Sequence, residues 1–283
     1  MDLKEIRRLV IIALFSDDEL MEKFVLKGGN ALDIVYNIGT RSSVDVDLSM
    51  PDDFSDIEDA KTRIFRALRD RFDSAGFVVF DEKFQLRPSV LREGQNPRWG
   101  GYQIDFKIAD RATYEKYKDD IEALRRNASL VGPEQKRTFR VDISKYEFVE
   151  PKEETEIDNY TVYVYTPAML AIEKLRASCQ QMPEYELRRN PKPRARDFYD
   201  IHAIVTTEKI AITTPENIEL VRNIFAAKSV PLSLISNIKN TRDYHVIDWP
   251  AVEQSVSGEL KDYDFYFDFV VELAEQLQAA GVE

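Results

Sequence analysis

Ser43-Val44-Asp45-Val46-Asp47-Leu48 is the stretch that decides the fold, because apolar and acidic residues alternate strictly along it. Successive side chains of a strand point to opposite faces, so Asp45 and Asp47 share one face and the apolar residues share the other. Two carboxylates on one face repel each other, and aspartate is depleted in strands. A divalent cation such as Mg²⁺ would remove that cost. The stretch therefore indicates either a metal site or a solvated edge strand with two exposed acids.

Upstream of this strand, Gly28-Gly29 lies between a predicted strand at 24–26 and a predicted helix that begins near Asn30. Glycines at such a turn allow backbone N–H groups to approach a phosphate closely. A plain tight turn explains the same two glycines. The order of the motifs favours the phosphate interpretation, since Arg41-x-Ser43-x-Asp45-x-Asp47 follows at about the distance of one helix.

Downstream, Gln103-Ile104-Asp105-Phe106-Lys107-Ile108 alternates in the same way and places Asp105 and Lys107 on a polar face. If this strand neighbours the first, three carboxylates converge and Lys107 partly compensates them. An ordinary half-exposed strand is the alternative interpretation.

Two helical motifs carry charge in unusual places. Lys174 shares its helix face with small and apolar residues, which indicates either a phosphate-binding ammonium or a lysine whose stem lies along apolar surface. Asp197 and Asp200 lie one turn apart near the start of a later helix. Acids in a first turn also interact favourably with the helix dipole, so a purely structural role is the alternative.

Between these two helices lies a basic patch of five residues, Arg188, Arg189, Lys192, Arg194 and Arg196. Clustered Lys and Arg are sufficient to contact an RNA backbone. A solvated loop or a docking site for an acidic partner explains the patch equally well.

Composition restricts the function classes. The chain has 283 residues and a net charge of −12, which disfavours a general nucleic-acid coat protein. One cysteine and two histidines exclude a disulfide framework, a CxxC zinc site and a multi-histidine metal site. No signal peptide or membrane span is expected, and the predicted location is cytoplasmic.

The element pattern predicts an α+β fold with two parts. Residues 1–150 are expected to form a domain with a mixed sheet and helices, and residues 151–283 a mainly helical domain. The acidic, apolar-poor run at 151–158 is the predicted boundary between them.

The order of these motifs resembles the nucleotidyltransferase fold. The runs Lys27-Gly28-Gly29-Asn30-Ala31-Leu32 and Arg41-Ser42-Ser43-Val44-Asp45-Val46-Asp47 are more similar still to the AbiEii/MenT-type nucleotidyltransferase toxins. The lysine helix at 170–177 and the segment Arg196-Asp197-Phe198-Tyr199-Asp200-Ile201 are similar to the back-half motif of that family. Two departures are Asn30, where the family more often has a hydroxyl residue, and the longer stretch at 180–193.

The resemblance implies that residues 1–150 form the catalytic domain and that residues 151–283 complete the cleft for nucleotide and acceptor. It also implies a role for each matching residue. The metal ligands for Mg²⁺ or Mn²⁺ are Asp45, Asp47 and Asp105, and Asp105 is also a candidate base. The nucleotide-binding residues are Gly28, Gly29, Asn30, Arg41, Ser43 and Lys174. Asp197 positions Lys174 or the base, which completes a catalytic set of Asp45, Asp47, Asp105, Lys174 and Asp197.

By the same resemblance, the chain moves an NMP from an NTP to an acceptor hydroxyl, at the 3′ end of a tRNA, as the toxin of a type IV-like toxin–antitoxin system with a cognate antitoxin protein. Transfer to hydroxyls of proteins or small molecules is the enzymatic alternative. A nucleotide-binding module without turnover, acting through partners, is the alternative that involves no catalysis.

Overall fold

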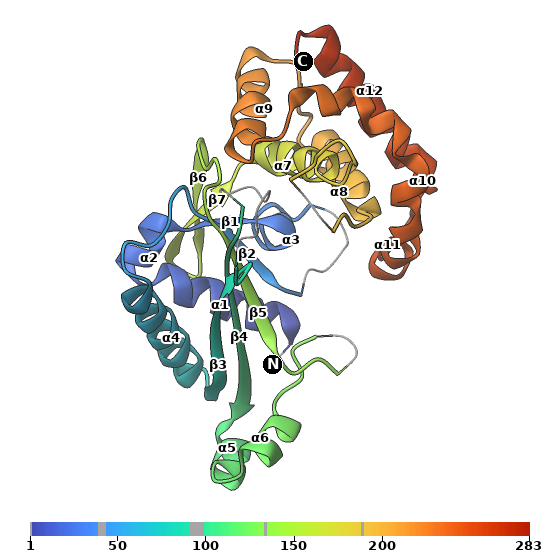
Figure 1. The fold of residues 1–283 in the computed structure, drawn as a ribbon. Helices are drawn as coiled ribbons and strands as arrows, with labels where there is room; N and C mark the ends of the chain where they lie inside the picture. Colours follow the sequence, from blue (N-terminus) through green and yellow to red (C-terminus); the bar gives the residue numbers. More distant parts are fainter. Residues whose placement is uncertain (1, 39–43, 91–98, 133–134, 188–189) are drawn as a thin grey trace.

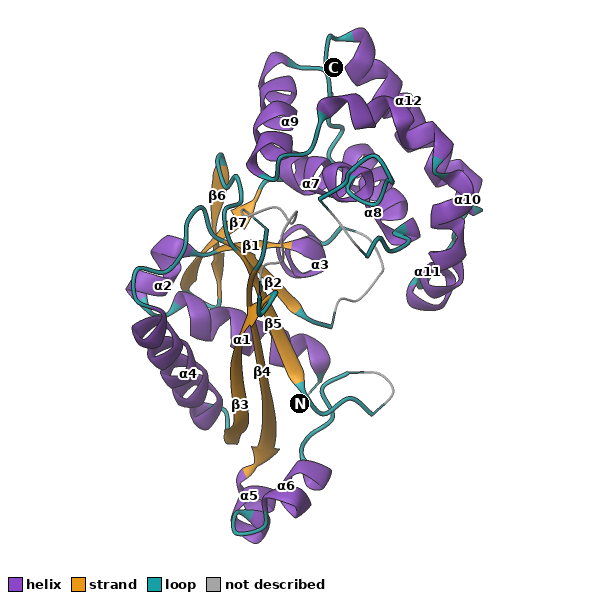
Figure 2. Ribbon diagram, viewed as in Figure 1, coloured by secondary structure: helices purple, strands orange, loops and turns teal. Residues whose placement is uncertain are grey.

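A computed structural model describes residues 2–38, 44–90, 99–132, 135–187 and 190–283. The chain folds into a mixed seven-stranded sheet flanked by helices, followed by a helical part that lies at one end of the sheet (Figures 1 and 2). The predicted fold class, an α+β chain with a sheet-containing first part and a mainly helical second part, is confirmed.

The strand order in the sheet is β3-β4-β5-β2-β1-β7-β6. The strands are β1 (Val25–Lys27), β2 (Val46–Ser49), β3 (Phe77–Arg87), β4 (Gly101–Asp110), β5 (Phe139–Ser144), β6 (Lys152–Ile157) and β7 (Tyr160–Tyr165). Two neighbouring pairs, β2 with β5 and β1 with β7, are parallel, and the other pairs are antiparallel. The sheet therefore continues past the predicted boundary at residue 150, and the acidic run beyond it is the edge strand β6.

The helices that precede or flank the sheet are α1 (Leu3–Phe15), α2 (Asp18–Lys23), α3 (Gly28–Asn30) with its π-helical continuation η1 (Ala31–Tyr36), α4 (Ile57–Ser74), α5 (Arg111–Tyr117) and α6 (Ile121–Asn127). The helical part contains α7 (Pro167–Cys179), α8 (Ala195–Thr207), α9 (Pro215–Ala227), η2 (Leu232–Asn240), α10 (Arg242–His245), η3 (Val246–Asp248), α11 (Trp249–Ser255) and α12 (Tyr263–Ala279). None of the helices in the described ranges is long and apolar enough to cross a membrane.

The main core lies between the sheet and helices α1 and α4. Alternation along β4 places Tyr102, Ile104 and Phe106 on the buried face, where Phe106 packs its ring against Phe72 of α4 and Phe139 of β5. The opposite, polar face of the same strands is thereby left for the functional site. In the helical part, Phe198 stacks on Phe267 and holds α8 against α12.

We expect Phe106→Ala to destabilise the fold by about 3–5 kcal/mol, because the substitution leaves a cavity between two aromatic rings in a fully buried site. Urea unfolding of the variant and the wild-type chain measures this loss. The matched control is Phe265→Ala on α12, where the side chain is 45% exposed, and a loss below about 1 kcal/mol is expected. Equal losses at the two positions would contradict the core described here.

Candidate active site

The Gly28-Gly29 turn joins β1 to α3 and packs against the acidic strand. Gly28 has a positive φ of 69°, a conformation that favours glycine. A Cβ atom at this position would lie 2.5 Å from Oδ2 of Asp47. Glycine is therefore required here for two reasons, the backbone conformation and the close approach of the Asp47 carboxylate.

Three carboxylates share one face of the sheet at this turn. Asp45 immediately precedes β2, Asp47 lies within it, and Asp142 lies opposite Asp47 on the parallel neighbour β5. Burial raises the pKa of Asp47 to about 6, although Lys27 opposes the shift, and the negative charges of Asp142 and Asp45 add to it. Burial also raises the pKa of Asp142, with Asp45 again contributing. The site thus holds more negative charge than its own residues neutralise.

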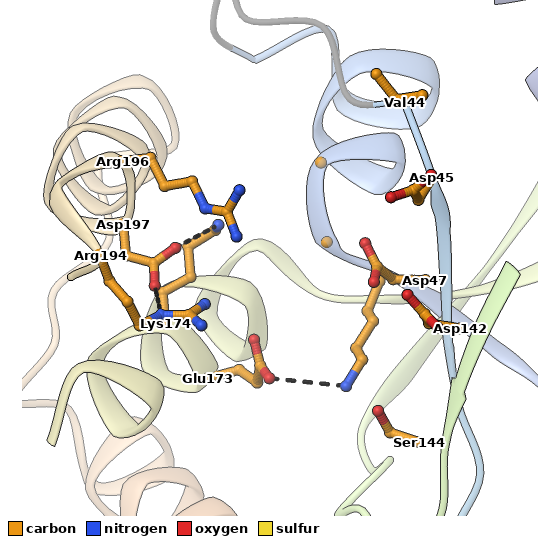
Figure 3. A pocket seen from close by; sticks show the side chains of 13 residues that line it. Val44, Asp45, Asp47, Asp142, Ser144, Glu173, Lys174, Arg194, Arg196 and Asp197 are labelled. Atoms are coloured by element: carbon orange, nitrogen blue, oxygen red, sulfur yellow. Dashed lines mark hydrogen bonds and ion pairs between the residues drawn. The ribbon is translucent and has the colours of Figure 1, made fainter. Parts of the chain in front are cut away.

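Helices α7 and α8 of the helical part form the facing wall (Figure 3). The Lys174 side chain is buried, and its Nζ lies 3.3 Å from Oδ1 of Asp197 and 2.6 Å from Oδ2 of Asp200. Burial alone would raise the pKa of Asp197, but the charges of Arg194 and Lys174 outweigh it and hold that pKa well below its usual range. Arg194 also bonds to Asp197 directly.

A buried ionic cluster lies between the two walls and joins them. Glu147 follows β5 and lies 3.4 Å from Lys27, 3.2 Å from Lys228 and 3.8 Å from Arg176. Glu173 completes the cluster, 2.9 Å from Arg176 and 3.7 Å from Lys27. Burial alone would raise the pKa of Glu147, but the surrounding cations lower it to about 2. The same two carboxylates outweigh burial at Lys27 and raise its pKa, so this lysine stays charged.

The two walls enclose a cavity of about 430 Å³, within the range typical of small-molecule sites. Its lining residues are Lys27, Gly28, Gly29, Val44, Asp45, Asp47, Asp142, Ser144, Glu173, Lys174, Arg194, Arg196 and Asp197. Carboxylates therefore face lysine and arginine across one cavity, an arrangement suited to a metal–triphosphate complex, in which a cation and anionic phosphates are bound together.

Comparison with known proteins identifies the family. Residues 11–269 match the family described as "Nucleotidyl transferase AbiEii toxin, Type IV TA system". The chain belongs to this family. The predicted resemblance to the AbiEii nucleotidyltransferase toxins is confirmed. No curated protein matches the chain.

Three of the solved structures with a similar fold come from Helicobacter pylori and Mycobacterium tuberculosis. A proposed nucleotidyltransferase from Helicobacter pylori has 15% sequence identity and a TM-score of 0.52, with 98% of this chain and 93% of that chain covered. The H. pylori protein JHP933 has 17% identity and a TM-score of 0.49, with coverages of 97% and 90%. The MenT4 nucleotidyltransferase toxin of Mycobacterium tuberculosis has 14% identity and a TM-score of 0.49, with coverages of 99% and 86%. At these identities the first similarity supports the fold alone.

The structure brings together most of the residues that the sequence singled out. Those that line the cavity are Gly28, Gly29, Asp45, Asp47, Lys174, Arg194, Arg196 and Asp197. Arg194 is held by Asp197 inside the site, Arg196 is exposed at its edge, and Lys192 is exposed but is not one of the lining residues. Arg41, Ser43, Arg188 and Arg189 lie outside the described residues.

Asp105 is not among the residues that line the cavity. Its strand β4 does not neighbour β2, because β5 lies between them in the sheet. Its carboxylate accepts hydrogen bonds from Arg140 at 3.0 Å and Gln103 at 2.6 Å. The third carboxylate in the cavity is Asp142, which the sequence analysis did not single out. The alternation Phe139-Arg-Val-Asp-Ile-Ser144 carries the same signal as the other two strands and could have identified it.

Asn30 also does not line the cavity. Its side chain is fully buried, and its Nδ2 donates to the backbone oxygen of Asp45 at 2.5 Å. Its Oδ1 accepts a hydrogen bond from Arg7 at 3.2 Å. Asn30 therefore fixes the backbone at the start of the acidic strand, a role that a shorter hydroxyl side chain at this position could not fill in the same way. Lys27, Glu173 and Arg7 are further site residues that the sequence analysis did not identify.

The chemistry of the carboxylates fits a divalent cation. Asp45, Asp47 and Asp142 offer hard oxygen ligands. Burial and the neighbouring carboxylates raise the pKa of Asp47, and a bound cation would offset both effects. Among the described residues, no three Asp, Glu, His or Cys side chains are already arranged around a metal position. Nζ of Lys136 lies 2.7 Å from Oδ1 of Asp45, so a metal held by Asp45 would displace this ammonium or bind through the other carboxylate oxygen.

We expect Gly28→Ala to weaken Mn²⁺ binding at least tenfold, because the added methyl group displaces the Asp47 carboxylate. The positive φ should also cost about 1–2 kcal/mol of stability. Gly76→Ala is the matched control, since Gly76 has a φ of 84° and its Cβ would meet nothing within 4 Å. Electron paramagnetic resonance measures Mn²⁺ affinity and urea unfolding measures stability. A similar loss of affinity in both variants would contradict the proposed contact.

We expect Asp47→Asn to stabilise the metal-free chain at pH 7.5 by on the order of 1–3 kcal/mol. The lower end of this range allows for solvent in the cavity, which screens the charge of Asp47 and reduces the free energy that corresponds to its pKa shift. The folded chain raises the pKa of Asp47 from 3.8 to about 6, so it favours the protonated acid. The stability that protonated Asp47 gives the wild-type chain is complete below pH 3.8 and is lost as the pH rises through about 6. The advantage of the variant over wild type should therefore be larger at the higher pH. Unfolding in EDTA at pH 5 and pH 7.5 measures the effect, and a variant that is no more stable than wild type at pH 7.5 would contradict it.

Proposed function

We propose that this AbiEii nucleotidyltransferase transfers an NMP from an NTP to the 3′-hydroxyl of a tRNA with the help of Mg²⁺ or Mn²⁺. The observation that carries the proposal is the pair of facing walls, with carboxylates on β2 and β5 and with cations on α7 and α8. The two walls are matched to the two parts of the donor substrate. The carboxylates suit a metal ion, whereas the lysine and arginines suit the triphosphate.

In this reaction the acceptor oxygen attacks the α-phosphorus and the bond to the β-phosphate oxygen breaks, so that pyrophosphate leaves. A bound divalent ion neutralises charge on the reacting phosphates. The chain's own residues mainly bind and orient the substrates. Asp45, Asp47 and Asp142 would hold the ion, and Asp142 is also placed to accept the acceptor proton, since burial raises its pKa.

On the opposite wall, Lys174 is fixed by two buried aspartates, so its ammonium has one defined position. A fixed cation orients phosphates better than a flexible one, because less side-chain freedom is lost on binding. Arg196 is exposed at the edge of the cavity and has room to contact the departing pyrophosphate or the acceptor. The predicted role of Asp197, to position Lys174, agrees with this geometry.

The tRNA acceptor, a cognate antitoxin and a cytoplasmic location belong to the same proposal. The family description names a type IV toxin–antitoxin system, and a toxin of this kind requires a partner that limits its damage.

We expect purified chain, incubated with each α-labelled NTP, Mg²⁺ and total tRNA, to attach label to tRNA. Asp45→Ala/Asp47→Ala should reduce the rate at least about 100-fold, because the charge-neutralising site is lost. Asp243→Asn, at an exposed position far from the cavity in the sequence, is the control and should keep full activity. Label on protein or small molecules instead of tRNA would overturn the acceptor assignment, and NTP binding without transfer to anything would overturn the transfer reaction.

A further inference from the structure

One face of strands β3, β4 and β5 carries a continuous polar surface that begins at the active site. Strand pairing places Asp47, Asp142, Gln103 and Gln85 in one row across the sheet, and Ser144, Gly101 and Arg87 in the next. A third row contains Arg140, Asp105 and Lys83. Paired residues of neighbouring strands point to the same side. We call this surface the polar sheet face; it consists of Lys83, Gln85, Arg87, Gln103, Asp105, Lys107, Arg140, Asp142 and Ser144.

The polar sheet face is basic although the whole chain is acidic. It carries four cations, Lys83, Arg87, Lys107 and Arg140, against two carboxylates, Asp105 and Asp142. Its formal charge is therefore +2, whereas the chain has a net charge of −12. Lys83 and Arg87 are exposed, and no ion pair with an acid is found for either of them within the described part of the chain.

The exposed part of this face is its β3 edge, where Lys83 and Arg87 lie at the surface, whereas Gln103 at its centre is only 8% exposed. Helices α1 and α4 pack on the other, apolar face of the sheet, where Ile104 and Phe106 are fully buried. Helices α5 and α6 close the far end, where Leu124 packs with Phe80 and Ala109 (bottom of Figure 1). The near end opens into the cavity at Asp142 and Ser144. A molecule lying on this face would thus reach the catalytic carboxylates directly.

The dimensions suit a short stretch of one nucleic-acid strand. From Lys83 to Arg87 the strand extends about 14 Å, at roughly 3.4 Å per residue. The two cations are thus far enough apart to contact different phosphates of one strand. Gln85 lies between the two cations and accepts a hydrogen bond from Arg87 at 2.7 Å, which orients that guanidinium at the surface.

An acidic acceptor also needs such a surface for an electrostatic reason. The 3′ end of an RNA must approach three clustered carboxylates on a protein of net charge −12, and its own phosphates are repelled by both. Cations beside the approach offset that repulsion. The same cations would attract an acidic protein, but only the acceptor has to lie along a path that ends at the transfer site.

We propose that the polar sheet face binds the backbone of the acceptor RNA, with Arg87 and Lys83 contacting its phosphates while its 3′ end enters the cavity. This inference rests on the proposed function, since it assigns a place to the acceptor of that reaction. The proposed RNA-binding surface extends beyond the nucleotide cavity and includes the row of Arg140, Asp105 and Lys83. In that row Asp105 holds Arg140 in place.

The test compares two double variants with the same change of charge. Lys83→Gln/Arg87→Gln removes two cations from the polar sheet face. Lys61→Gln/Arg66→Gln removes two cations from α4, on the other side of the sheet, where these side chains are exposed and pair with Glu58 and Asp17. Fluorescence anisotropy with 5′-labelled tRNA in the absence of NTP measures binding at several salt concentrations.

We expect the face variant to bind tRNA at least tenfold more weakly at about 0.1 M salt and to show a salt dependence reduced by one to two phosphate contacts. The α4 variant should bind within about twofold of wild type, and the KM for NTP should be unchanged in both. Equal weakening in the two variants, or unchanged binding in the face variant, would overturn the inference. So would an acidic protein that competes fully with tRNA while tRNA transfer continues.

Because binding is measured without turnover, the inference and the proposed function can fail separately. Transfer to tRNA with an unchanged KM for tRNA in the face variant would leave the function standing and overturn the inference. Binding of tRNA at this face without any transfer would support the surface and overturn the proposed reaction.

Discussion

The architecture of the active site depends on one buried carboxylate. Glu147 is surrounded by Lys27 from the sheet and by Arg176 and Lys228 from the helical part. Removing one member of such a group leaves buried charges unpaired and typically costs about 3–5 kcal/mol. Because Lys27 also lines the cavity, the interactions that join the two parts of the chain also fix the distance between the acidic wall and the basic wall.

The clustered carboxylates of the acidic wall lower the stability of the fold, because their negative charges are partly buried close together. Asp47 and Asp142 lie side by side on parallel strands, and their pKa values are raised although Lys27 and Arg140 oppose the shifts. Strain of this kind clusters at functional sites. Across the cavity the situation is reversed, since Lys174 and Arg194 hold Asp197 ionised. Each wall is thus electrostatically complementary to a different half of a metal–nucleotide complex.

Much of this site could be predicted from the sequence because its signals are local. Alternation revealed the strand of Asp45 and Asp47, and the glycine turn and the helix of Lys174 followed from spacing. Strand order could not be predicted, because alternation shows which face a residue occupies but not which strand lies next to it. The sequence therefore predicts Asp105 of β4 as the third carboxylate, whereas the strand that neighbours β2 is β5, which carries Asp142.

Two other features needed tertiary structure. The acidic run after residue 150 was taken as a boundary because it lacks apolar residues, but an exposed edge strand favours such charges since they discourage pairing with other chains. The role of Asn30 depends on Arg7, which lies 23 residues away in the sequence. Hydrogen bonds between such distant residues leave no periodic pattern.

The ion pair between Lys136 and Asp45 has a consequence for the affinity of the acidic wall for a metal ion. The lysine acts as a resident counter-ion that offsets one negative charge of the acidic wall while no metal is bound. A divalent ion held by Asp45 would compete with a charge that is tethered to the chain and cannot diffuse away. The acidic wall would therefore bind a metal less tightly than three carboxylates without a neighbouring ammonium.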